Sequence, residues 1–164
     1  NHDELLPCNF VVIDITASPE YIALAYVWGD ATDRDSILVD GQVIRVTRNL
    51  RDALEKFRRT PAWLWVDALC INQQIVSEKS VKVSMMSKVY LKASCVAVWL
   101  GRDANGDADA IFEDTKVTVE FTTRVDKASL ERFLQLPYWS RTWVLQEVGL
   151  ANEAVILWGN QVWQ

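Results

Sequence analysis

Two residues near the C-terminal end of the sequence, Trp143 and Glu147, have residue types and a spacing suited to binding a nucleotide. In a helix, this spacing of four places the two side chains one turn apart on the same face. The flat indole ring can stack on a base, while the carboxylate can address the attached sugar. The pair therefore predicts a nucleotide-sugar site on the helix that carries Glu147.

Polar residues also follow three predicted strands. Trp28-Gly29-Asp30 comes after the strand over 21–27, Asp67 ends the strand over 63–66, and Gly101-Arg102-Asp103 follows the strand over 95–100. Open α/β sheets bind their ligands at the carboxyl ends of the strands, near the switch in strand order. We therefore expect Trp28, Gly29, Asp30 and Asp67 to lie around one ligand site.

Several kinds of chemistry have no residues to support them. The only histidine is His2, the three cysteines have no CxxC spacing, and the six glycines are isolated from one another. A Ser-His-Asp or Cys-His mechanism, a metal held by His or Cys, a P-loop and a GxGxxG turn are therefore not expected. The net charge of −5, with scattered Lys and Arg, disfavours nucleic acid as a partner.

The elements that must position these residues follow from the hydrophobic pattern. Asn49 is a predicted N-cap for a helix that Pro61 stops, and Ser77, Ser129 and Ser140 open three further predicted helices, the last reaching about Ala151. Met86, Val89, Tyr90 and Ala93 share one face of the second helix, and no element is predicted over 101–128. Strands are predicted over 10–13, 21–27, 36–39, 42–46, 63–66, 95–100 and 154–158.

This order of elements predicts one α/β domain over residues 1–164, with a parallel sheet and helices on both of its faces. Asp40-Gly41 lies between two β-rich runs and predicts a β-hairpin inserted into that plan. The run Trp63-Leu64-Trp65-Val66 is wholly apolar, as expected of a strand buried on both faces. No apolar run has the length of a membrane span, and the start lacks both a secretory signal and Met, so we expect a cytoplasmic fragment of a longer protein.

Four sequence blocks resemble the heterokaryon incompatibility (HET) family of fungi. They are Tyr21-Ile-Ala-Leu-Ala-Tyr-Val-Trp-Gly-Asp30, Leu64-Trp-Val-Asp-Ala-Leu-Cys-Ile-Asn-Gln73, the segment 86–101 that ends in Val98-Trp-Leu-Gly101, and Tyr138-Trp-Ser-Arg-Thr-Trp-Val-Leu-Gln-Glu-Val148. The resemblance covers a core of residues 21–159. It departs from the family where Ala25 replaces a Ser and where Lys82 stands near a usual Gln.

The resemblance implies a death effector in self/non-self recognition, activated through an upstream recognition protein or domain. It also implies a likeness to Toll/interleukin-1 receptor (TIR) domains, which share the flavodoxin-like plan. Many TIR domains cleave NAD⁺ at the nicotinamide–ribose bond with a helical glutamate, in a string similar to Ser140-Arg-Thr-Trp-Val-Leu-Gln-Glu-Val148. NAD⁺ would then be a substrate, no cofactor would be tightly bound, and the active form would be a homo-oligomer.

Under this resemblance each candidate residue has a role. Glu147 would be the catalytic carboxylate, Trp143 and Trp28 would wall the pocket, Asp67 or Asp30 would anchor the ribose or a loop, and Arg141 would meet the pyrophosphate. A carboxylate stabilises the oxocarbenium-like state, and the leaving nicotinamide departs neutral, so no histidine acid is needed.

Structural interpretations stand beside these roles. Glu147 could simply pair with Arg141, Asp67 could cap the following turn, and Asn72 and Gln73 could be turn residues. Trp65 and Trp99 are expected in the core, and Cys70 is expected to be an inert thiol. The alternative function is a non-catalytic, self-associating signalling module.

Overall fold

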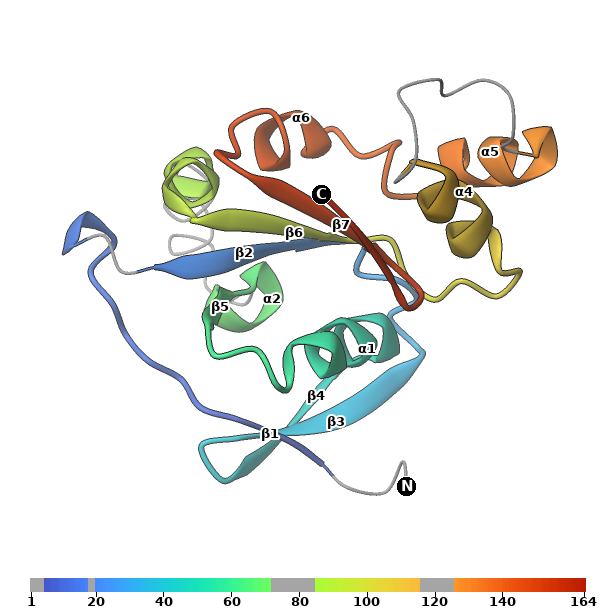
Figure 1. The fold of residues 1–164 in the computed structure, drawn as a ribbon. Coiled ribbons are helices and arrows are strands. Elements are labelled where there is room, and N and C mark those ends of the chain that lie inside the picture. Colours follow the sequence, from blue (N-terminus) through green and yellow to red (C-terminus); the bar gives the residue numbers. More distant parts are fainter. Residues whose placement is uncertain (1–4, 18–19, 72–84, 116–125) are drawn as a thin grey trace.

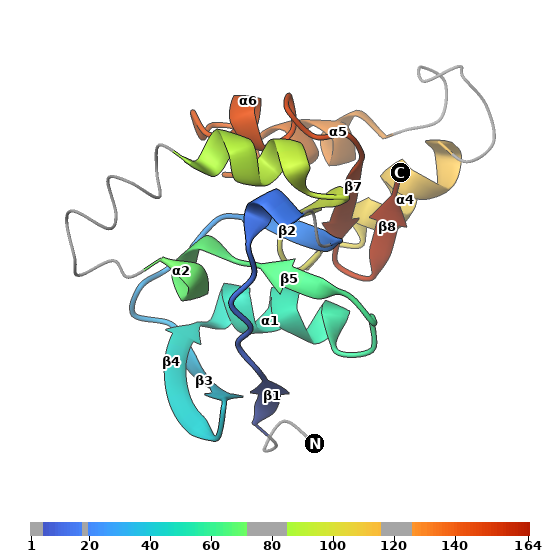
Figure 2. The same ribbon diagram turned by 90° about the vertical axis from the view of Figure 1, so that its left-hand side faces the viewer.

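The computed structural model describes residues 5–17, 20–71, 85–115 and 126–164. A five-stranded sheet forms the centre of the molecule, and a smaller three-stranded sheet lies beside it (Figures 1 and 2). Helix α1 (Arg48–Phe57) lies between the two sheets. The predicted asparagine and glutamine turn at 72–73 and the predicted cap at Ser77 lie outside the described residues.

The central sheet confirms the predicted parallel α/β plan. Its order is β5-β2-β6-β7-β8, and each neighbouring pair is parallel except β7 with β8. The strands are β2 (Tyr21–Tyr26), β5 (Trp63–Trp65), β6 (Cys95–Trp99), β7 (Ala154–Trp158) and β8 (Gln161–Trp163). Numbered along the chain, the four parallel strands follow the order 2-1-3-4, which is that of flavodoxin-like sheets. The switch in strand order therefore lies between β2 and β6.

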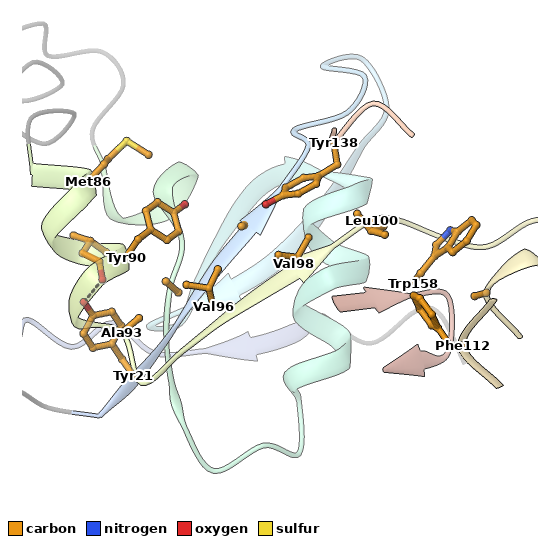
Figure 3. Packing of buried hydrophobic residues seen from close by; sticks show 14 of the residues in the cluster. Tyr21, Met86, Tyr90, Ala93, Val96, Val98, Leu100, Phe112, Tyr138 and Trp158 are labelled. Atoms are coloured by element: carbon orange, nitrogen blue, oxygen red, sulfur yellow. Dashed lines mark hydrogen bonds between the residues drawn. The ribbon is translucent and has the colours of Figure 1, made fainter. Parts of the chain in front are cut away.

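Successive side chains of the central strands point to opposite faces of the sheet, and both faces are buried. Ala23 and Ala25 of β2 belong to one core with Val96 and Val98 of β6, which the helix over 85–92 covers (Figure 3). The predicted helical stripe in this core is confirmed, because Met86, Val89, Tyr90 and Ala93 are all buried. The next residues along both strands, Leu24, Tyr26, Ala97 and Trp99, form the second core with α1 and the small sheet.

The inserted hairpin is confirmed as the main part of the small sheet. Strand β3 (Arg34–Val39) pairs antiparallel with β4 (Gln42–Thr47), and Asp40 and Gly41 both have positive φ, at 48° and 78°. Two left-handed residues match the twist of a tight hairpin turn. The short β1 (Leu6–Cys8) pairs parallel with β3 on its other side.

Three helix boundaries differ from the predictions. Thr47, not Asn49, caps α1, because its extended backbone lets Oγ1 accept the Leu50 amide at 3.4 Å. Asp126, not Ser129, caps α5 (Lys127–Leu134). The helix expected from Ser140 to Ala151 is reduced to the single turn α6 (Val144–Glu147), with turns on both sides.

An unpredicted helix, α4 (Asp107–Thr115), occupies part of the segment expected to be irregular. Its first residue ties it to α5, since Asp107 accepts hydrogen bonds from Arg132 Nε at 2.8 Å and Ser129 Oγ at 2.8 Å. Both partners belong to α5, which lies beside α4 (Figure 1). Ala108, Ile111 and Phe112 form the buried apolar face of α4, so this polar contact adds to the apolar packing.

Two strand predictions are wrong. Residues 10–13 form no strand; they cross between the sheets with exposed side chains, and the Phe10 amide is bound by the Asp40 carboxylate at 3.2 Å. Strand β5 is an edge strand, so Trp63 is 51% exposed instead of buried on both faces. The remaining short elements are η1 (Ile15–Ala17) and α2 (Asp67–Cys70). No helix within the described ranges is long and apolar enough to cross a membrane.

Candidate functional site

Glu147 lies at the centre of a buried polar cluster. Its carboxylate is 1% exposed and accepts three hydrogen bonds: from Arg141 Nη2 at 3.0 Å, from Arg141 Nη1 at 3.3 Å and from the Tyr138 hydroxyl at 3.0 Å. The two bonds from Arg141 reach different oxygens, so the ion pair is bidentate. The structural interpretation of Glu147 as the partner of Arg141 is therefore confirmed, and the carboxylate is almost fully removed from water.

Local backbone geometry brings these three residues together. The Arg141 amide donates to the Tyr138 carbonyl at 3.2 Å, which closes a turn and places both side chains on the same side of the chain. The Arg141 guanidinium lies over the Tyr138 ring, 5.6 Å from its centroid. The Glu147 amide donates to the Trp143 carbonyl at 2.9 Å, so the single turn of α6 returns the carboxylate toward that guanidinium.

Arg141 also ties this cluster to the central sheet. Its Nη1 donates to the main-chain carbonyl of Tyr26 at 2.7 Å, at the carboxyl end of β2. The Arg141 side chain is 22% exposed, so it lies at the boundary between the buried carboxylate and solvent. Among the described residues, Nε and the second hydrogen of Nη2 have no acceptor. The same side chain can therefore hold Glu147 and still donate to an anionic ligand.

A second pair, Trp28 and Asp67, lies at the same end of the sheet. Trp28 Nε1 donates to Asp67 Oδ2 at 3.0 Å, and nearly half of the Trp28 surface is exposed. Strands β2 and β5 are parallel neighbours, so the residues that follow them meet at one edge. Asp67 Oδ1 also accepts the Ala68 amide at 2.7 Å, but Asp67 is the first residue of α2 and Val66 is the N-cap, so the predicted capping role is not seen.

The two carboxylates of the site share an electrostatic environment. Burial raises the pKa of Glu147, and the charge of Arg141 with the Tyr138 hydroxyl bond opposes that rise. Burial likewise raises the pKa of Asp67, against the hydrogen bonds from Trp28 and the Ala68 amide and the charge of Arg141. Each carboxylate thus responds to the same guanidinium. Two negative groups facing one positive group leave the cluster with a net charge of −1 when both are ionised.

Asn49 braces the switch point between β2 and β6. Its Nδ2 donates to the Val27 carbonyl at 2.6 Å, and its Oδ1 accepts from Trp99 Nε1 at 2.8 Å. Gly29 has a φ of 77°, and a Cβ placed on it would lie 3.3 Å from Asn49 Cβ. The chain therefore leaves β2 through a turn that fits closely against the first turn of α1.

Two of the predicted site residues do not join the cluster. Asp30 is exposed, and its Oδ1 binds the amide and hydroxyl of Thr32 at 2.8 and 2.7 Å, in a local turn. Trp143 is 37% exposed, and its ring makes no hydrogen bond or ring contact within the described parts of the chain. Trp28, Asp67, Arg141 and Glu147 are brought together, with Gly29 at the base of the turn that carries Trp28.

The prediction from sequence missed three residues of the site: Tyr26, Tyr138 and Asn49. Tyr26 and Tyr138 lie within the sequence blocks that carry the family resemblance, so their position there was a usable signal. Asn49 gave no such signal, because an asparagine near a helix start is ordinarily a cap. Its role depends on Val27 and Trp99, which lie far from it in the chain.

A separate apolar cavity of about 360 Å³ opens at the β5 edge. It is bordered by the segment 11–15 and by the helix over 85–92. Val12 is fully exposed beside it, and Phe10, Val11, Ile13 and Trp63 are each at least 40% exposed. This surface is distinct in chemistry from the polar cluster. No three His, Cys, Asp or Glu side chains gather into a possible metal site within the ranges described.

Comparison with known proteins gives one family and one curated relative. Residues 21–147 match the model of the family described as Heterokaryon incompatibility protein (HET). Heterokaryon incompatibility protein 6, OR allele, of Neurospora crassa is 35% identical over 153 residues, which cover 82% of this chain and 22% of that protein. The chain thus spans about a fifth of the length of this relative. No solved structure matches this chain.

Proposed function

The chain belongs to the heterokaryon incompatibility (HET) family, and from that premise we propose that it is a death effector domain that cleaves NAD⁺ at the nicotinamide–ribose bond. The observation that supports this proposal most strongly is the cluster at the switch point of the sheet. There a buried carboxylate, a guanidinium with spare donors and a half-exposed indole lie at the carboxyl ends of parallel strands. This edge is where doubly wound sheets bind nucleotides.

In the proposal, Arg141 binds the pyrophosphate. A guanidinium offers planar, paired donors that suit phosphate oxygens. Its Nε and the second hydrogen of Nη2 are available to phosphate oxygens while Nη1 and Nη2 hold Glu147. In the proposal, the bound phosphate takes up part of the Arg141 charge, which lets the Glu147 carboxylate turn toward the ribose.

The chemical step then needs one negative charge and no acid. As the glycosidic bond breaks, its electron pair leaves with nicotinamide, which departs neutral, and positive charge builds on the ribose ring. A carboxylate stabilises that charge, and water supplies the new C–O bond and loses its proton. Glu147 is the proposed carboxylate. Its burial lets its charge act in a medium of low dielectric, where it is strongest.

The test is nicotinamide release from NAD⁺ by the purified chain, held at high concentration or clustered on an oligomeric scaffold. The wild-type chain should release nicotinamide and the Glu147→Gln chain should not, because the amide keeps the shape and loses the charge. Circular dichroism and thermal melting must show that the variant is folded. A folded, clustered wild-type chain that releases no nicotinamide would overturn the proposal.

A non-catalytic, self-associating signalling module is the second candidate function. The exposed apolar row over residues 10–13, with Trp63 and the cavity beside them, favours it. Surfaces of this kind ordinarily contact another protein. Val12→Asp should abolish death signalling under this function and leave nicotinamide release by the artificially clustered chain unchanged.

Cell death in cells that express each variant distinguishes the two functions. If cell death requires turnover, Glu147→Gln abolishes it. If cell death requires only association, Glu147→Gln kills as well as the wild type.

A further inference from the structure

Trp28 is held as a rigid, half-exposed platform. Its Nε1 donates to Asp67 Oδ2 at 3.0 Å, which orients the ring from one edge, while 46% of the residue stays accessible. Gly29 follows it with a φ of 77° and fits against Asn49, so the backbone that carries the ring is also braced. An indole held in this way loses little conformational freedom when a flat ligand stacks on it.

Asp67 is the carboxylate of the site with surface left for a ligand. Glu147 is 1% exposed, and its oxygens accept three hydrogen bonds, whereas Asp67 is partly exposed and accepts hydrogen bonds from Trp28 and the Ala68 amide. Arg141 pairs directly with Glu147 at 3.0 Å, so its charge only partly offsets that of Asp67.

An exposed indole beside a carboxylate whose charge is only partly offset attracts a particular ligand. The negative face of the indole binds a cation by cation–π attraction, and the carboxylate adds a direct Coulombic attraction. A flat ring that carries a positive charge gains from the cation–π attraction, from the Coulombic attraction and from stacking on the indole. A neutral flat ring uses stacking alone.

We propose that Trp28 and Asp67 form a subsite for a positively charged heteroaromatic ring, the pyridinium end of the dinucleotide, and not for a neutral base. This inference rests on the proposed function, because it states which end of the substrate the indole receives. It also explains a feature that the catalytic roles leave unused, namely the second carboxylate at the edge of the site. The product ring is neutral, so the subsite would release it once the bond has broken.

The test compares two ligands of nearly equal shape, the cation 1-methylnicotinamide and neutral nicotinamide. Binding to the 164-residue chain is followed by NMR through the indole N–H signal of Trp28, which is assigned from its loss in Trp28→Phe. The cation should bind at least about threefold more tightly than the neutral ring. Trp28→Leu should abolish binding of both ligands.

Asp67→Asn should remove the preference for the cation and leave residual binding of nicotinamide. Glu131→Gln, which removes one negative charge from the exposed face of α5, is the control for long-range charge and should keep the preference. Trp63→Leu, which removes a tryptophan that is 51% exposed at the β5 edge, should change neither affinity. Thermal melting of each variant reports whether it is folded.

The inference is overturned if nicotinamide binds as tightly as the cation, if Asp67→Asn keeps the preference, or if the folded wild type binds neither ligand. These readouts do not depend on turnover. Selective cation binding without nicotinamide release contradicts the proposed function and leaves the subsite standing. Nicotinamide release without cation selectivity contradicts the subsite alone.

Discussion

Arg141 donates a hydrogen bond of 2.7 Å to the main-chain carbonyl of Tyr26, a residue 115 positions earlier in the chain. The same guanidinium pairs with Glu147, so one side chain connects the end of β2 to α6. The site exists only while this connection holds. Residues at its two ends should therefore be coupled in stability as well as in function.

Breaking the buried pair from one side should be costly. Arg141→Met leaves the almost fully buried Glu147 without a counter-charge, so the carboxyl group must either stay charged in the interior or take up a proton, and we expect a loss of about 3 kcal/mol in the free energy of unfolding. The double variant Arg141→Met/Glu147→Gln should lose less than the sum of the two single variants, because no buried charge remains. Urea unfolding of the four proteins measures this coupling.

The control for that cycle is a pair of similar geometry at the surface. Arg102 binds Asp52 with two bonds of 2.7 Å, but its side chain is 60% exposed. Arg102→Met should cost less than about 1 kcal/mol. Equal losses for Arg102→Met and Arg141→Met would show that burial is not what makes the Glu147 pair important.

Replacing the side-chain nitrogen of Asn49 by an oxygen should lower the stability of the fold. Asn49→Asp keeps an oxygen to accept from Trp99 but places a second, charged oxygen against the Val27 carbonyl, where Nδ2 now donates at 2.6 Å. We expect a loss of about 2 kcal/mol, measured by urea unfolding, since a good hydrogen bond becomes a repulsion. Asn160→Asp is the control. There the exposed amide oxygen accepts from Lys56 at 2.7 Å, and a carboxylate would strengthen that contact.

Gly29 and Gly41 offer a matched comparison, because their φ angles are 77° and 78°. Alanine at either position should incur the left-handed backbone cost of about 1 kcal/mol. At Gly41 the new Cβ meets no atom within 4 Å, whereas at Gly29 it lies 3.3 Å from Asn49 Cβ. Gly29→Ala should therefore lower the melting temperature more than Gly41→Ala. If the two variants melt together, the close fit of the Trp28 turn against α1 is not a source of stability.

Low pH should weaken the contact between Asp107 of α4 and the residues Arg132 and Ser129 of α5. The Arg132 guanidinium and the Ser129 hydroxyl hold the pKa of Asp107 well below its usual range. A carboxyl group whose folded pKa is depressed contributes stability above its unfolded pKa, which is about 3.9, and loses that contribution as the pH falls through the folded value. Asp107→Asn should thus be less stable than the wild type at pH 7, and the two should converge progressively as the pH falls below about 4.

Urea unfolding between pH 7 and pH 2 measures this convergence. Asp109→Asn, on the same helix, is the control and should run parallel to the wild type. A difference between Asp107→Asn and the wild type that stays constant over this range would contradict the role of the Asp107 carboxylate in coupling the two helices.

The central strands could be predicted because their sequence signal is local. The runs that contain Ala23, Ala97 and Ile156 are apolar and continuous, and Asp40-Gly41 specifies its own turn through positive φ angles. The four residues Met86, Val89, Tyr90 and Ala93 likewise lie on one face by helical periodicity alone. All of these features depend on residues that are close to one another in the sequence.

Other features could not be predicted, because their partners are distant in the chain. The segment 10–13 has the composition of a strand, but it pairs with neither sheet and its side chains are exposed. Helix α4 is tied to Arg132 of α5, and the long helix expected around Glu147 gives way to one turn that lets the carboxylate meet Arg141.

By itself, the sequence determined the α/β class and the hairpin, and it offered seven candidate site residues: Trp28, Gly29, Asp30, Asp67, Arg141, Trp143 and Glu147. The tertiary structure decided which of them form a buried ion pair and which form a half-exposed indole–carboxylate pair. In the structure Asp30 lies apart from these residues, in a local turn with Thr32, and Asn49 donates to the Val27 carbonyl beside them. The physical reason is that burial and hydrogen-bond partners depend on which strands become neighbours. The order β5-β2-β6 brings together residues that no local pattern relates.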